Sequence, residues 1–123
     1  MRKEINIGGK QMVITSSAFT MFSYKNLFQG NLLEDLSELE TSMSGLEKMS
    51  DEEQIKVLQP ILEKLLRMAY IMNDEAEQDV PYFQEWLKGI KYMFKDRTWI
   101  KEVMEVASSC FLGNLEEAEQ PAE

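Results

Sequence analysis

The feature that most limits the fold of this sequence is a pair of apolar helical stripes on either side of Gly30. Over residues 18–28, apolar side chains recur at steps of three and four, which is the spacing of one face of an α-helix. Gly30 can adopt the left-handed conformation that ends a helix, and three leucines then continue the stripe: Leu32, Leu36 and Leu39. The sequence therefore predicts two amphipathic helices, at about 17–29 and 31–41, that meet at a tight corner and must bury their apolar faces.

Short polar side chains stand where these two helices should begin. Ser16 or Ser17 can cap the first helix, because a hydroxyl accepts a hydrogen bond from an otherwise unpaired backbone N–H. Asn31 can cap the second, and Glu34, three residues later, is placed to bond back to it as in a capping box. Both helices thus carry a start signal.

A longer helix is predicted over residues 51–77, beginning with a capping box formed by Ser50 and Glu53. Proline lacks the N–H that bonds to the preceding turn, so Pro60 should kink or break this helix near residues 56–59. Acidic or amide residues recur at alternate positions over 73–79, as in a calcium loop, but the segment lacks the central glycine and distal glutamate of an EF-hand. A solvated helix end is the favoured interpretation.

Residues 4–14 predict a β-hairpin. Gly8-Gly9 suits a two-residue primed turn, and pairing across this turn places Ile5 opposite Met12. Apolar residues then share one face: Ile5, Ile7, Met12 and Ile14. A phosphate-binding glycine loop is not supported, because neither the GxGxxG nor the GxxxxGKS context is present.

The C-terminal half predicts two more helices, at about 81–94 and 98–112, and then an acidic tail over 114–123 that should be disordered. Asp79 can cap the first of these helices and Gly113 can end the second. The fold class is therefore mainly α (α+β): an N-terminal hairpin followed by about five helices in one folded domain, 1–113. Aromatic residues concentrate at protein interfaces, and five are candidates for partner binding: Phe22, Tyr82, Trp86, Tyr92 and Trp99.

Composition excludes several kinds of chemistry. The sequence has no histidine, which rules out His-based zinc sites and Ser-His-Asp catalysis, and its carboxylates lie at helix ends, where capping explains them. A net charge of −9 argues against binding to nucleic acid or anionic membranes. The one cysteine, Cys110, fits a reducing cytoplasm and a packed, unreactive thiol, and no signal peptide is visible. We therefore expect a binding protein without a cofactor or metal, not an enzyme.

The order of motifs resembles the tail assembly chaperones of long-tailed phages and prophages of Gram-positive bacteria. A short hairpin precedes Ser-Ala, Tyr-Lys, Phe and Asp-Leu at set intervals; a long helix follows with Ala-Tyr, and then a Phe-x-x-Trp-Leu motif after a proline. The residues that carry the resemblance are Ser17, Ala18, Tyr24, Lys25, Phe28, Leu32, Asp35, Leu36, Ala69, Tyr70, Phe83, Trp86 and Leu87. One departure is Gly8-Gly9, where Asn-Gly is expected in the family.

This resemblance implies a non-structural factor that works in the host bacterial cytoplasm and is absent from the mature virion. Family members coat the long, apolar, helical tape-measure protein, keep it soluble and help recruit tail tube subunits. In many relatives a translational frameshift adds a second domain that binds the tube protein. Some relatives self-associate, so a homo-oligomer is a further expectation.

Two other functions stay open from the residues alone. A structural tail or head-completion protein would be present in the mature virion, where a chaperone would be absent. A small acidic inhibitor or DNA mimic would need acids arrayed at phosphate-like spacing on one surface, whereas here they are spread over helix ends and a tail. Recovery of a nuclease or repressor from host lysate would favour the inhibitor.

Overall fold

The computed structural model describes residues 1–112, and it begins with the hairpin. Strands β1 (Arg2–Ile7) and β2 (Lys10–Thr15) pair antiparallel with Ile5 opposite Met12, which confirms the predicted register. The predicted apolar face is buried throughout. Gly8 and Gly9 have φ values of 57° and 89°, as a type I′ turn requires at both central positions.

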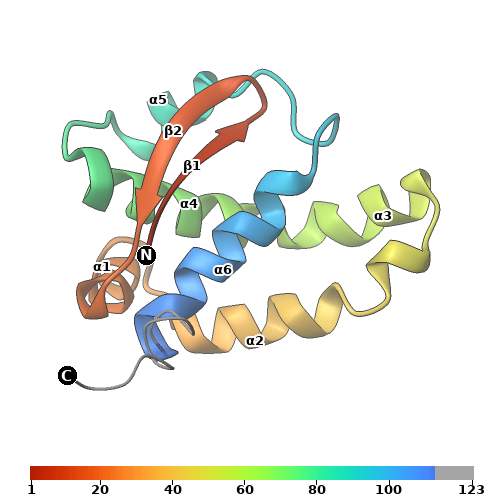
Figure 1. Ribbon diagram of the computed structural model, residues 1–123, viewed down its shortest axis with the longest axis horizontal. Coiled ribbons are helices and arrows are strands. Elements are labelled where there is room, and N and C mark those ends of the chain that lie inside the picture. The colour runs from red at the N-terminus through yellow and green to blue at the C-terminus, as the bar shows by residue number, and fades with distance from the viewer. Residues whose placement is uncertain (113–123) are drawn as a thin grey trace, which may run out of the picture.

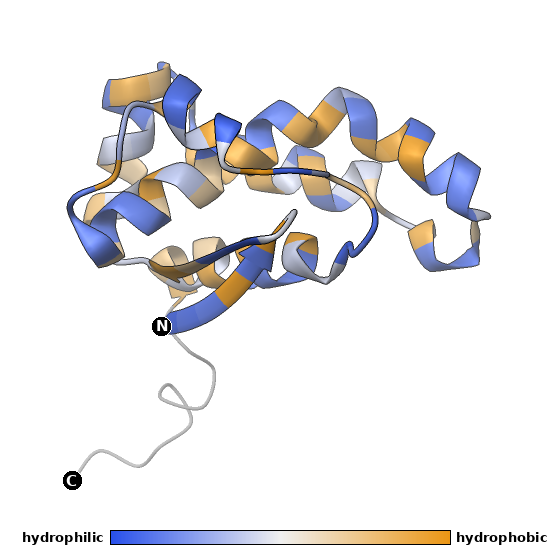
Figure 2. Cartoon of the chain, turned by 90° about the horizontal axis from the view of Figure 1, so that it is seen from above, coloured by the Kyte–Doolittle hydropathy of each residue, from blue (hydrophilic) through white to orange (hydrophobic). Residues whose placement is uncertain are grey.

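Helices make up most of the rest, so the mainly α (α+β) fold class is confirmed. Their bounds are α1 (Ala18–Phe28), α2 (Leu32–Ser42), η1 (Leu46–Lys48), α3 (Asp51–Leu58), η2 (Gln59–Ile61), α4 (Leu62–Glu77), α5 (Phe83–Lys88) and α6 (Thr98–Leu112), where η marks a 3₁₀ turn. Hydrophobic and hydrophilic segments alternate along the helices and the hairpin (Figure 2), the pattern of elements with one buried face. No helix within residues 1–112 is long and apolar enough to cross a membrane.

Helix α4 is the centre of the core. Its apolar residues are buried from Leu65 to Met72, and it contacts β2 on one side and α1 and α6 on others. The hairpin lies across α4 and α6, with β1 against α6 (Figure 1). Helices α1 and α3 lie at opposite ends of the molecule in this view, and α2 runs along the face away from the hairpin.

The expected break at Pro60 is confirmed. The predicted 51–77 helix is divided by η2 into α3 and α4, because the proline nitrogen cannot continue the helical hydrogen bonds. Ser17, Asn31 and Ser50 cap α1, α2 and α3 as predicted: each side chain accepts a hydrogen bond from a backbone N–H of the first turn.

The expected role of Gly30 is wrong. The left-handed residue that ends α1 is Gln29, with φ of 60°. Gly30 is instead required for close packing, since a Cβ there would lie 2.6 Å from a ring carbon of Tyr24.

The predicted helix over 81–94 is also wrong in extent, because it is helical only over Phe83–Lys88. Asp79 does not cap it, since α5 begins four residues further on and Tyr82 occupies the cap position. Beyond α5 the chain turns to meet the hairpin, where the Lys91 N–H donates to the Gly8 carbonyl at 2.8 Å. Gly113 and the predicted tail, 114–123, lie outside the described residues.

This contact makes Gly8 a sensitive position. A Cβ at Gly8 would lie 1.9 Å from the Tyr92 carbonyl oxygen, whereas Gly45, with φ of 78°, has nothing within 4 Å. Gly45→Ala should cost about 1 kcal/mol of unfolding free energy, the penalty of a left-handed alanine. Gly8→Ala adds a backbone clash and should cost about 3 kcal/mol or more. Urea denaturation of the two variants tests this, and equal losses would contradict the packing of 90–92 on the turn.

Candidate functional site

Helix α1 exposes apolar side chains on the face turned away from the core. Its buried face carries Thr20 and Tyr24. On the outer side Phe19, Phe22 and Leu27 are 63%, 57% and 55% exposed. Leu33, one residue into α2, is also 55% exposed. We call Phe19, Phe22, Leu27 and Leu33 the α1 surface. A helix at the protein surface normally has a polar outer side, so large apolar side chains on both sides of α1 are unusual.

Two grooves flank α1. The first, between α1 and α2, has a volume of about 480 Å³, and its lining includes Phe22, Leu33 and Phe111 with Lys25 at its edge. The second, between α1 and α4, has a volume of about 360 Å³ and is lined by Phe19, Ser23, Asn26, Leu27, Tyr70, Ile71 and Asp74. Phe22 and Leu33 of the α1 surface therefore border the first groove, and Phe19 and Leu27 border the second.

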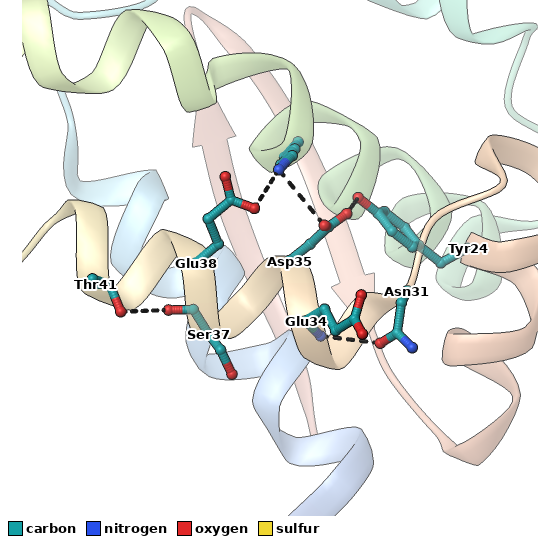
Figure 3. A network of polar contacts seen from close by, with 8 residues as sticks. Tyr24, Asn31, Glu34, Asp35, Ser37, Glu38 and Thr41 are labelled. Atoms are coloured by element: carbon teal, nitrogen blue, oxygen red, sulfur yellow. Dashed lines mark hydrogen bonds and ion pairs between the residues drawn. The ribbon is translucent and has the colours of Figure 1, made fainter.

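Polar contacts on the inner side fix how α1 is rotated. The Tyr24 hydroxyl donates to Asp35 Oδ2 at 2.6 Å, joining α1 to α2 (Figure 3). Asp35 also forms an ion pair with Lys64 of α4 at 3.7 Å. The Thr20 hydroxyl donates to Glu75 Oε1 at 2.8 Å, which ties the first turn of α1 to the end of α4. With Thr20 and Tyr24 held inward, α1 presents Phe19, Phe22 and Leu27 outward.

A cluster of aromatic side chains packs α1 against α4 and α5. Phe28 and Phe83 lie 5.2 Å apart between ring centroids, Phe83 and Tyr70 5.3 Å, and Tyr70 and Trp86 5.4 Å, all edge to face. Several residues that carry the family resemblance meet in this cluster and beside it: Tyr24, Phe28, Asp35, Tyr70, Phe83 and Trp86. These motif residues therefore have a packing role that joins α1, α2, α4 and α5.

Trp86 and Trp99 are buried, so their assignment as partner-binding residues is wrong. The Trp86 indole N–H donates to Asn73 Oδ1 at 2.9 Å inside the core, and the Asn73 amide donates to the Val13 carbonyl of β2. The Trp99 indole N–H donates to the Met93 carbonyl at 3.2 Å. Both rings are anchored within the chain, because a buried indole needs an acceptor for its N–H.

The other three candidates are exposed. Phe22 belongs to the α1 surface, Tyr82 is 85% exposed in the segment before α5, and Tyr92 is 41% exposed beside the hairpin turn. Sequence reasoning missed Phe19, Leu27 and Leu33. The sequence does contain a signal for two of them. Phe19 and Leu27 lie outside the row of positions that is buried on α1, so apolar residues occur on both sides of that helix.

The described residues offer little reactive chemistry. Among residues 1–112 no three His, Cys, Asp or Glu side chains are grouped to hold a metal ion. Burial, together with the negative charge of Glu75, raises the pKa of the Cys110 thiol to about 11. This thiol is therefore protonated at neutral pH and is a weak nucleophile, as the sequence analysis expected.

Comparison with known proteins adds no relative. No protein-family model, no curated protein and no solved structure matches the chain.

The Tyr24–Asp35 bond gives a stability prediction with a defined pH dependence. Burial and the hydrogen bond to Asp35 raise the pKa of Tyr24 above its ordinary value of 10.0. Between pH 10 and this raised pKa, Tyr24 stays protonated in the folded protein and ionises in the unfolded chain, so stability falls as pH rises. Tyr24→Phe should lose about 1–2 kcal/mol of unfolding free energy at pH 7.

The unfolding free energy of Tyr24→Phe should depend less on pH above pH 10 than that of the parent chain. The advantage of the parent chain over Tyr24→Phe should shrink by up to about 1.4 kcal/mol per pH unit above pH 10. Urea denaturation of both proteins at pH 7, 10 and 11 measures this. A difference that is constant across the three pH values would contradict the role given to the hydroxyl.

Proposed function

We propose that this protein is a phage tail assembly chaperone that binds and solubilises the tape-measure protein through the α1 surface. The observation that carries the proposal is an exposed apolar helix face flanked by two grooves, in a chain of net charge −9. Helix-in-groove recognition uses surfaces of this kind, and a tape-measure protein presents apolar helical segments to them. The family resemblance in the sequence supports the same function.

The size of the surface suits reversible binding. Complete burial of a Phe or Leu side chain is worth about 1.5–3 kcal/mol. Because the four side chains of the α1 surface are each somewhat more than half exposed, covering them contributes about 3–7 kcal/mol before the entropy of association is subtracted. One contact of this strength is weak, and many copies along one long client would bind it by avidity. Such a coat can dissociate when the tail tube replaces it.

The remaining parts of the proposal follow from the resemblance. The protein acts in the host bacterial cytoplasm, helps recruit tail tube subunits, and is absent from the mature virion. A frameshift-extended form would supply the contact with the tube protein, and self-association would help it form a continuous coat. Net negative charge keeps a crowded coat soluble through mutual repulsion.

Co-expression with the tape-measure protein that the proposal names as the client tests the proposal. The parent chain should keep the tape-measure protein in the soluble fraction and co-purify with it. The double variant Phe22→Ser, Leu27→Ser removes one apolar side chain from each groove and should reduce recovery at least about tenfold, because two buried anchors are lost.

Ile55→Ser is the matched control. Ile55 is an exposed apolar residue on α3, at the end of the molecule away from α1 (Figure 1), and its replacement should leave recovery unchanged. Circular dichroism should show that both variants are folded. A tape-measure protein that stays aggregated with the parent chain, or binding that survives the double variant, would contradict the proposal.

A further inference from the structure

The C-terminal end of α4 has an unbalanced negative charge. Asp74, Glu75 and Glu77 lie in its last turn, Asp79 follows two residues later, and no basic residue lies in that turn. The C-terminal end of a helix dipole is itself negative, so acidic side chains there are repelled. Basic residues would normally be expected at this position.

Two of these carboxylates have a structural explanation. Glu75 accepts the hydrogen bond of Thr20, and Glu77 accepts one from the Val13 N–H at 3.3 Å. The Asp74 carboxylate is exposed and makes no hydrogen bond or ion pair within the described residues 1–112. Its charge is thus unused by the fold.

Asp74 is also the single charged residue in the lining of the groove between α1 and α4. The rest of the lining is uncharged: Phe19, Leu27 and Ile71 are apolar, and Ser23 and Asn26 are polar. Tyr70 also lines the groove, and the negative charge of Asp74 adds to burial in raising the pKa of Tyr70. The groove therefore combines large apolar side chains with one uncompensated negative charge.

We propose that this groove binds a cationic amphipathic helix, whose apolar side chains lie against Phe19 and Leu27 and whose Lys or Arg side chain pairs with Asp74. The proposal rests on the proposed function, since it names the part of the client that α1 contacts. The walls of the groove are two helices, so a bound segment finds no open strand edge and must satisfy its own backbone hydrogen bonds. A helix does so, and its i, i+3, i+4 side chains project from one side.

A second copy of this chain is a poorer occupant than a cationic helix. The whole chain carries −9, and pairing two such surfaces would place further negative charge near Asp74. Like charges opposed across an interface disfavour association. Charge therefore selects a basic partner here.

Two synthetic peptides of about 18 residues, roughly five helical turns, test the proposal with the full chain. Both carry leucine at i, i+3, i+4 and i+7 positions and differ only in having lysine or glutamate beside the leucines. Fluorescence anisotropy at low salt should show the lysine peptide binding about tenfold more tightly than the glutamate peptide, and this preference should shrink at 0.5 M salt.

Substitutions then locate the site. Asp74→Asn should weaken the lysine peptide about three- to fivefold, the loss expected for an exposed ion pair, and should leave the glutamate peptide no weaker. Phe19→Ser should weaken both peptides. Glu40→Gln is the control, since it removes an exposed carboxylate of α2 that does not line the groove, and it should change neither affinity.

Three results would overturn the inference. They are equal binding of the two peptides, equal effects of Asp74→Asn and Glu40→Gln, and a Phe19→Ser variant that alters self-association in light scattering while peptide binding is unchanged. Failure here is distinct from failure of the proposed function, because co-purification with the tape-measure protein is measured separately and depends also on Phe22.

Discussion

The hydrogen bond between the Tyr24 hydroxyl and Asp35 determines which side of α1 faces the solvent. Tyr24 is buried, and its ring passes so close to Gly30 that no side chain fits there. Asp35 in turn pairs with Lys64, so one polar group fixes the relative positions of α1, α2 and α4. A buried hydroxyl that lost this acceptor would be costly, which makes other rotations of α1 unfavourable. The apolar outer face of α1 is a consequence of this inner contact.

Local patterns predicted the elements well. The alternation of apolar residues on either side of Gly8-Gly9 was sufficient to predict the hairpin register. Three capping residues marked the starts of α1, α2 and α3. The wrong predictions concern segments whose structure depends on contacts with residues that are distant in the sequence. The helix predicted over 81–94 stops at Lys88 because the following residues bind the hairpin turn, and that contact spans more than eighty residues of sequence. No local pattern contains it.

The candidate site was harder to predict than the fold, because aromatic character does not reveal exposure. Trp86 and Trp99 have the composition of interface anchors, yet Asn73 and the Met93 carbonyl satisfy their indole groups inside the core. The apolar stripe of α1 predicts the side that is buried, and it does not show that Phe19 and Leu27, which lie off that stripe, are exposed. The large apolar side chains on the exposed side of α1, and the Asp74 carboxylate at the negative end of α4, both break a local rule without benefit to the fold. Such departures are expected where a surface is kept for a partner.

The central claim is that α1 is covered when the client binds, and hydroxyl-radical footprinting with mass spectrometry measures this directly. Oxidation would be compared between the free protein and its complex with the tape-measure protein. The account predicts that Phe19, Phe22 and Leu27 become protected, while Ile55, on α3 at the other end of the molecule, is oxidised equally in both states. Unchanged oxidation of the α1 residues in a verified complex would contradict it.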